Sequence, residues 1–225
     1  MPRDPPLILL PGMGADRRLF GDQIAALDKV VVPDWIAPEP RDTLVSYAAR
    51  MARGVDPGVP CCVGGASFGG MVALEMAPYL QAKACFLIGS VRSPDELPWR
   101  ARMLTPAAWL VPAWSLRVAG RAAPTIIALA GRLMRPATQS TLRQFADADA
   151  RFVRWASLAI LRWKRPAQTA SVPVFQIHGD RDPVLPHRLT RPDVLVRGGG
   201  HLLSMTFPDA VNEFLETRMR ALGED

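Results

Sequence analysis

The sequence has few residues that could bind a metal or form disulfides. It contains three cysteines and three histidines in 225 residues. The cysteines are an odd number within apolar runs typical of buried strands, which favours a reducing compartment; they are Cys61, Cys62 and Cys85. No histidine has ligand-like partners at a useful spacing, so we expect no metal and no other cofactor.

The sequence also lacks any stretch that predicts a membrane span. Its longest apolar region, residues 104–134, is interrupted by arginines and prolines. The apolar run at 7–10 is too short for a signal peptide and ends in Pro-Gly without a small-residue cleavage site. With 49% hydrophobic and 21% charged residues, the chain has the composition of an ordinary globular protein. These features favour a cytoplasmic protein with one domain and room for an inserted subdomain.

Short apolar runs alternate with helix-like stretches at both ends of the chain. The runs that we interpret as strands are 7–10, 30–32, 61–64, 84–89, 173–178 and 194–196. The stretches that we interpret as helices are 17–27, 44–53, 68–76, 187–191 and 209–222. Continuous apolar strands separated by helices are typical of a parallel sheet that is covered on both faces. The pattern therefore predicts an α/β fold, a doubly wound and mostly parallel sheet.

The segment 92–166 differs from the rest of the chain, because it has several prolines, no clear strand and a helical pattern. We interpret it as a helical lid subdomain inserted into a core formed by residues 1–91 and 167–225. It holds five of the six tryptophans, which either line an acyl-binding cavity or pack the lid against the core.

The charge of the chain is concentrated in this same segment. Thirteen basic residues against four acidic ones give residues 92–166 a net charge of +9, whereas the whole chain has +6. Three interpretations remain open: a solvated basic surface, attraction to an anionic carrier such as an acyl carrier protein or coenzyme A, and contact with an anionic membrane surface. We expect no nucleic-acid partner, because no recognition motif accompanies the charge.

The most informative motif is Gly65-Ala66-Ser67-Phe68-Gly69, which lies between an apolar run and a helix-like run. A serine hydroxyl is a weak nucleophile unless the backbone presents it sharply and a base takes its proton. In a tight strand-to-helix turn, the positions two before and two after the serine must be small, because there the helix passes close to the strand. The motif therefore makes Ser67 a candidate nucleophile.

A nucleophilic serine needs a general base, and the imidazole of histidine suits neutral pH. His201 follows a glycine-rich loop directly after a predicted strand, so its side chain can reach over the sheet edge. His178 ends a buried strand and is expected to bond to nearby backbone, whereas His187 is expected to face solvent. The base in turn needs a carboxylate to hold it. We favour Asp182 as this carboxylate.

Two other aspartates are alternatives to Asp182. Asp180 lies nearer the strand end in the same loop, where we expect it to hold the turn. Asp95, which follows the preceding strand, is a third candidate. The order Ser67, Asp182, His201 runs nucleophile, acid, base, and all three follow predicted strands.

These motifs resemble those of the α/β-hydrolase superfamily, in its serine-nucleophile esterase and thioesterase-like branch. The resemblance rests on 65–69 as nucleophile elbow, 178–183 as acid loop and 200–201 as base loop, and it covers everything except the predicted lid. It implies a lid after the sixth-strand position of that fold. It also implies an oxyanion hole made by the backbone N–H groups of Phe68 and Met13.

The sequence departs from the family pattern at two positions. Pro11 stands where the family commonly has histidine before the glycine of the oxyanion loop, and Ala66 is smaller than the residue often found before the serine. Neither change removes a catalytic group. The resemblance implies hydrolysis of a carboxylic ester with a small or medium acyl group through an acyl-enzyme.

Alternatives to simple ester hydrolysis remain open. One is a thioesterase or carrier-linked esterase acting on acyl-carrier-protein or coenzyme A substrates. Another is different serine-dependent chemistry on the same fold, such as carbon–carbon bond hydrolysis or cofactor-free perhydrolysis. A further one is a non-catalytic binding protein on a hydrolase scaffold, against which the intact Ser67, Asp182 and His201 count.

Overall fold

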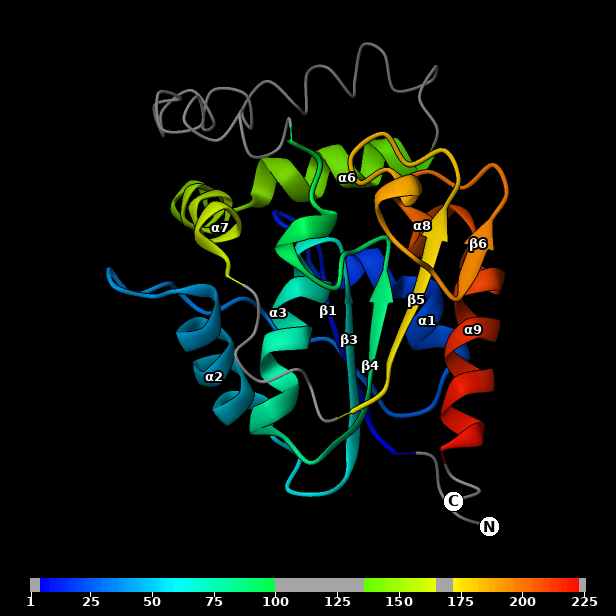
Figure 1. Cartoon of the computed structure of the whole chain (residues 1–225), viewed down its shortest axis with the longest axis horizontal. Helices are drawn as coiled ribbons and strands as arrows, with labels where there is room; N and C mark the ends of the chain where they lie inside the picture. Colours follow the sequence, from blue (N-terminus) through cyan, green and yellow to red (C-terminus); the bar gives the residue numbers. More distant parts are fainter. Residues whose placement is uncertain (1–4, 100–135, 165–171, 223–225) are drawn as a thin grey trace.

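A parallel six-stranded sheet forms the centre of the computed structural model, which describes residues 5–99, 136–164 and 172–222 (Figure 1). The strands are β1 (Leu7–Leu10), β2 (Val30–Val31), β3 (Cys61–Ala66), β4 (Ala82–Ile88), β5 (Val174–Gly179) and β6 (Val194–Val196). Their order is β2-β1-β3-β4-β5-β6, and all adjacent pairs are parallel. The predicted α/β fold class is confirmed.

Helices cover both faces of the sheet. On one face lie α2 (Leu44–Val55) and α3 (Phe68–Met76), and on the other lie α1 (Gly21–Ala26) and α9 (Pro208–Ala221) (Figure 1). Two clusters of buried apolar residues, one on each side, fill the space between the helices and the sheet. All residues of β1 and β3 are buried, as expected for strands covered on both faces. The sequence pattern of unbroken apolar runs reflects this double burial.

The helix predicted at 17–27 is divided in the structure. A 3-10 turn, η1 (Arg17–Phe20), is capped by the Asp16 side chain, and α1 begins at Gly21. The backbone of Phe20 at the junction is non-helical, with φ −110° and ψ 25°. A further short helix that the pattern did not indicate, α8 (Leu203–Thr206), follows the loop that carries His201.

The carboxyl ends of the strands meet at one edge of the sheet, beside two helices from the predicted lid segment. These are α6 (Pro136–Asp147) and α7 (Ala150–Arg162), seen at the top of Figure 1. The order of strands reverses between β1 and β3, and α/β sheets commonly bind ligands at the carboxyl ends of the strands beside such a reversal. The topology therefore directs attention to the loops after β1, β3, β4 and β5.

The predicted lid segment lies between β4 and β5, and only part of it belongs to the described residues. Trp109 and Trp114 lie outside them, as do the remaining residues of 100–135 and 165–166. Trp99 is described and exposed, whereas two other described tryptophans pack against the core. The Trp155 ring lies 4.3 Å from the Tyr47 ring between centroids, tilted by 39°, and Trp163 is buried. For these two tryptophans, packing is the observed role.

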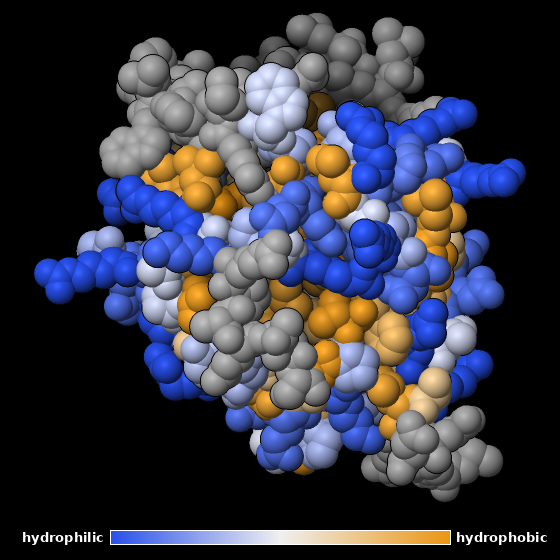
Figure 2. Space-filling view, viewed as in Figure 1, coloured by the Kyte–Doolittle hydropathy of each residue, from blue (hydrophilic) through white to orange (hydrophobic). Residues whose placement is uncertain are grey.

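The surface of the described residues is mixed in character. In Figure 2, hydrophilic side chains project around the outline, and hydrophobic residues show in separate groups between them. Large exposed hydrophobic side chains belong to different elements, among them Val45 on α2, Phe145 on α6 and Leu195 on β6. No helix within the described ranges is both long enough and apolar enough to cross a membrane.

Candidate active site

Ser67 occupies a strained turn between β3 and α3. Its backbone has φ 52° and ψ −120°, a region that non-glycine residues rarely adopt. A side chain at Gly69 would overlap the carbonyl oxygens of Leu10 and Pro11, and one at Gly65 would overlap the backbone of Gly69. The two glycines therefore let α3 pass close to β1 and β3, and the turn holds the serine at the carboxyl edge of the sheet.

Two buried polar residues support this turn, and sequence reasoning missed both. The Ser67 carbonyl oxygen accepts hydrogen bonds from Ser90 Oγ at 2.6 Å and from the Gly70 N–H at 3.1 Å. Gln176 Nε2 donates in turn to the Ser90 carbonyl oxygen at 2.7 Å. Both side chains are fully buried. The available signal was a polar residue within or directly after an apolar strand, because buried polar groups need partners.

The structure brings Ser67, His201 and Asp182 together in one hydrogen-bonded chain. Ser67 Oγ lies 3.0 Å from His201 Nε2, and His201 Nδ1 lies 2.7 Å from Asp182 Oδ2. Because a carboxylate only accepts hydrogen bonds, Nδ1 carries the hydrogen toward Asp182 and Nε2 is left to accept one from the serine. This is the tautomer that a general base next to a serine requires.

The other carboxylate oxygen of Asp182 also accepts hydrogen bonds, which hold the side chain in place. Asp182 Oδ1 accepts from the backbone N–H groups of Val184 at 2.8 Å and Leu185 at 2.9 Å. Burial by itself would raise the pKa of the Asp182 carboxyl, but the contact with His178 and the hydrogen bonds from His201 and the Leu185 N–H outweigh it. The net result is a pKa well below the usual range, so Asp182 is an anion beside His201 at neutral pH.

The other candidate aspartates and histidines make different contacts. Asp180 Oδ1 accepts a hydrogen bond from the Gly198 N–H at 2.7 Å, so it holds the turn next to the base loop. Asp95 lies in a 3-10 turn, η3 (Pro94–Glu96), and His187 begins another, η5 (His187–Leu189). His178 Nε2 lies 2.6 Å from the Leu185 carbonyl oxygen, a bond to nearby backbone of the kind expected from the sequence.

The loop after β1 passes directly beside Ser67. A Cβ atom at Gly12 would lie 3.8 Å from Ser67 Cβ, and the Ala15 N–H closes a turn onto the Gly12 carbonyl oxygen at 3.0 Å. Met13 is the second residue of this turn, and Gly14 adopts φ 73°. Phe68 is the first residue of α3, and the first N–H groups of a helix have no partner within it. The predicted donors Met13 and Phe68 thus belong to two segments that lie beside Ser67.

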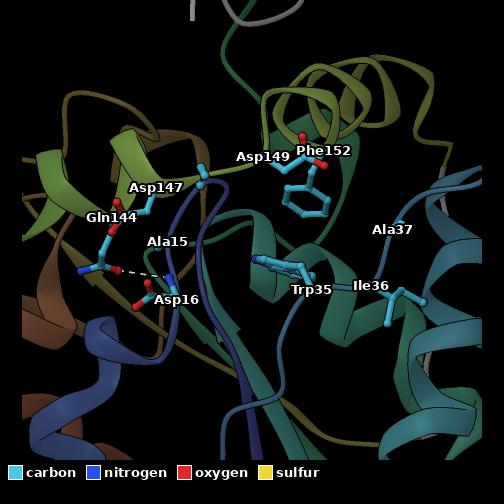
Figure 3. Close-up of a pocket in the computed structure, with 11 residues that line it drawn as sticks. Ala15, Asp16, Trp35, Ile36, Ala37, Gln144, Asp147, Asp149 and Phe152 are labelled. Carbon is cyan, nitrogen blue, oxygen red and sulfur yellow. Dashed lines mark hydrogen bonds between the residues drawn. The ribbon is translucent and has the colours of Figure 1, made fainter. Parts of the chain in front are cut away.

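A pocket of about 320 Å³ adjoins the loop after β1 (Figure 3). Trp35 and Phe152 form its aromatic wall, with ring centroids 5.0 Å apart and an angle of 30° between the planes. On the opposite side, the Asp16 N–H donates to Gln144 Oε1 at 3.1 Å. The remaining lining residues are Gly14, Ala15, Ile36, Ala37, Asp147, Ala148 and Asp149.

The aromatic wall of the pocket contacts the residue that directly follows Ser67. The Trp35 ring contacts the Phe68 ring at 5.6 Å between centroids, and Gly14 directly follows Met13. Arg18 joins the loop after β1 to α6 by pairing with Asp16 at 2.6 Å and Asp147 at 2.7 Å. Sequence reasoning did not identify Trp35, which lies in an irregular segment without periodicity. Within the described ranges, no group of three or more side chains is arranged to hold a metal ion.

Comparison with protein families gives one match over nearly the whole chain. Residues 7–214 match the model described as "Alpha/beta hydrolase family". Comparison with curated proteins gives no significant match.

Solved structures with this fold include several hydrolases. A thermophilic esterase from Thermogutta terrifontis has a TM-score of 0.73 at 21% identity, covering 97% of this chain and 90% of that one. A mutant of the N-acyl homoserine lactonase AidH, complexed with N-hexanoyl homoserine lactone, has a TM-score of 0.68 at 17% identity, with 97% and 90% covered. The enol-lactonase from Burkholderia xenovorans has 0.67 at 17% identity, with 96% and 91% covered. At these identities the likeness establishes the fold.

Proposed function

The chain belongs to the alpha/beta hydrolase family, and from this premise we propose that it is a serine hydrolase that cleaves carboxylic esters. The observation that carries the proposal is the hydrogen-bonded chain from Ser67 through His201 to Asp182. The esterase and the two lactonases of the same fold support it, because a lactone is a cyclic ester.

In the proposed mechanism, Ser67 Oγ attacks the ester carbonyl carbon while His201 Nε2 takes the hydroxyl proton. The electron pair of the carbonyl moves onto its oxygen, and the resulting imidazolium is stabilised by the Asp182 anion. Collapse of the intermediate breaks the bond to the alcohol, which receives the proton from His201. Water, deprotonated by the same imidazole, then attacks the acyl carbon and breaks its bond to Ser67 Oγ. The acid leaves, and Ser67 Oγ takes the proton back from His201.

The oxyanion of the intermediate needs donors, and we assign these to the backbone N–H groups of Met13 and Phe68. Both belong to segments that lie beside Ser67, one in the turn after β1 and one at the start of α3. Each donor of this kind contributes about 3 kcal/mol to stabilising the transition state. Pro11 and Ala66, where the sequence departs from the family pattern, do not change this assignment, because backbone groups supply the hydrogen bonds.

We propose that the pocket beside Trp35 and Phe152 receives the acyl group. It adjoins the turn that carries Met13, and its aromatic wall contacts Phe68. Its volume of about 320 Å³ lies at the lower end of the range for small-molecule sites, which supports a small or medium acyl group. Because α6 and α7 supply Gln144 and Phe152 to this pocket, we also propose that residues 92–166 act as a lid over a core of 1–91 and 167–225.

A thioester or carrier-bound substrate is the second candidate, and the basic composition of residues 92–166 is the feature that favours it. Kinetics can separate the two. We propose a panel of nitrophenyl esters with acyl chains of increasing length, together with acyl-coenzyme A thioesters of the same chains. Hydrolysis of short and medium esters by wild type, lost in Ser67→Ala and kept in the control Ser46→Ala, is the expected result. Hydrolysis of the thioesters alone would favour the second candidate, and turnover retained by Ser67→Ala would overturn the proposal.

A further inference from the structure

His178 is a second histidine in contact with the loop that carries Asp182. Its side chain is fully buried at the end of β5, and the hydrolysis mechanism above gives it no part. His178 Nε2 lies 2.6 Å from the Leu185 carbonyl oxygen and 3.4 Å from Asp182 Oδ2. The nearer contact has the length of a hydrogen bond, and the longer one is an electrostatic contact with the carboxylate.

The surroundings of the His178 ring fix its tautomer. Both neighbours of Nε2 are acceptors, a carbonyl and a carboxylate, so Nε2 carries the hydrogen. Nδ1 is buried and has no hydrogen-bond partner. A hydrogen on Nδ1 would therefore be an unpaired buried donor, which is costly, whereas a bare lone pair there is tolerated better. The ring is a neutral donor that points at the acid loop.

The contacts of this one ring act on both ends of the turn that holds Asp182. The Leu185 N–H binds Asp182 Oδ1, and the Leu185 carbonyl oxygen binds His178, so the same residue is tied to both side chains. Asp182 Oδ2 is then flanked by His201 at 2.7 Å and by His178 at 3.4 Å. Loss of the His178 donor would free the Leu185 carbonyl and allow the turn, with the carboxylate on it, to shift.

We infer that His178 is a positioning residue for catalysis, which holds Asp182 Oδ2 at the distance that keeps His201 aligned on Ser67. The inference rests on the proposed function of that site. A purely structural histidine would affect folding stability alone. A positioning histidine acts on the rate of the chemical step, because a misplacement of about 1 Å in a catalytic arrangement can cost about 100-fold in rate.

The test uses two variants at position 178 and a matched control. His178→Met removes the donor but keeps an apolar side chain of similar length, and His178→Gln places an amide N–H the same number of bonds from the backbone as Nε2. His187→Met makes the same change at a histidine outside the site, in η5. For each protein, kcat and KM on nitrophenyl butyrate and the rate constant for labelling by a fluorophosphonate are measured, together with the melting temperature.

We expect His178→Met to lower kcat and the labelling rate constant about 10- to 100-fold with KM nearly unchanged. His178→Gln restores most of both, and His187→Met behaves as wild type. A folded His178→Met with wild-type kcat and labelling overturns the inference while the proposed function stands. Absence of both labelling and ester turnover in wild type would instead refute the proposed function.

A measurement on the wild-type protein covers the case in which His178→Met does not fold. Nitrogen-15 NMR of histidine-labelled protein reports which ring nitrogen carries the hydrogen. We expect His178 as the Nε2–H tautomer, with hydrogen-bonded Nε2 and bare Nδ1. The Nδ1–H tautomer would overturn the inference, because such a ring could not donate to Leu185 or toward Asp182.

Discussion

Replacing Asp182 by asparagine tests the triad through a single atom. Asp182 Oδ1 accepts two backbone hydrogen bonds, from Val184 and Leu185, while Oδ2 faces His201 Nδ1 at 2.7 Å. In Asp182→Asn, the amide oxygen keeps the two backbone donors, because turning the amide over would leave two buried N–H groups facing an NH₂ group. Each unsatisfied buried donor costs about 1–3 kcal/mol.

The asparagine NH₂ group must then face His201 Nδ1. An NH₂ group donates, so Nδ1 becomes the acceptor and the hydrogen of the neutral imidazole moves to Nε2. In that tautomer Nε2 cannot accept the proton of Ser67, and the general base is lost. The expected decrease in kcat is about 10⁴-fold, which corresponds to about 5 kcal/mol in the activation free energy.

The assay is steady-state hydrolysis of the best ester from the panel, with thermal unfolding to verify that the variant is folded. Asp180→Asn is the matched control, because its amide oxygen can still accept from the Gly198 N–H, and Asp180 holds the turn next to the base loop rather than His201. We expect Asp180→Asn to keep wild-type kcat. A folded Asp182→Asn that retained more than about a tenth of wild-type kcat would refute the assignment of Asp182 as the carboxylate partner.

Two further predictions concern stability. In Gly69→Ala the new methyl group meets the Leu10 carbonyl oxygen, a backbone atom, so we expect urea unfolding to show a free energy of unfolding lower by at least about 1–3 kcal/mol. Gly54 lies within α2 with open space around it, so Gly54→Ala should raise the free energy of unfolding by about 0.5–1 kcal/mol. Equal stabilities for the two variants would contradict the close approach of α3 to β1. Burial raises the pKa of Glu75 from its ordinary value of 4.5, and the Trp163 indole N–H donates to its carboxylate at 2.6 Å. A raised pKa in the folded state means that this group favours folding below pH 4.5 and that the benefit is lost as the pH rises through the folded-state pKa. Glu75→Gln keeps an acceptor for Trp163 without the charge. Its free energy of unfolding should therefore exceed that of wild type by about 1 kcal/mol at pH 8, with a smaller difference at pH 4. A difference independent of pH would show that the charge is not the cause.

The sheet could be predicted from the sequence because its strands are buried on both faces. Such strands give unbroken apolar runs, as at Leu7–Leu10 and Cys61–Ala66, and these runs need no knowledge of tertiary contacts. Their ends were less accurate, since β3 extends two residues beyond the predicted run at 61–64. The helix predicted at 17–27 was divided in the structure because hydrophobic periodicity continues across a junction where the backbone leaves the helical region.

The candidate site could be predicted only where local sequence dictates local geometry. The glycines around Ser67 are of that kind, because the turn itself excludes larger residues. The choice between Asp182 and Asp180 depended on which carboxylate reaches His201, a distance set by loops that are 19 residues apart in the chain. Ser90, Gln176 and the second contact of His178 depend on strand neighbours in the folded sheet. A polar residue in or after an apolar strand signals that it needs a partner, but not which partner it has.

The pocket also depends on contacts between segments that are distant in the sequence. Trp35 lies in an irregular segment between β2 and α2, and Phe152 lies on α7, more than a hundred residues later. Their stacking arises from packing between segments that show no common sequence pattern. We expected the tryptophans of the predicted lid either to line a cavity or to pack against the core. The tryptophan in the pocket wall, Trp35, lies outside that segment.

The most direct test of Ser67 as an activated nucleophile is labelling of the protein by a fluorophosphonate, measured as intact mass, for wild type, Ser67→Ala and His201→Ala. The probe reports an activated serine without knowledge of the substrate. We predict one label per wild-type chain, none on Ser67→Ala and strongly slowed labelling of His201→Ala. Folded wild type that remains unlabelled, or Ser67→Ala that is labelled as fast as wild type, would contradict the assignment of Ser67 as an activated nucleophile.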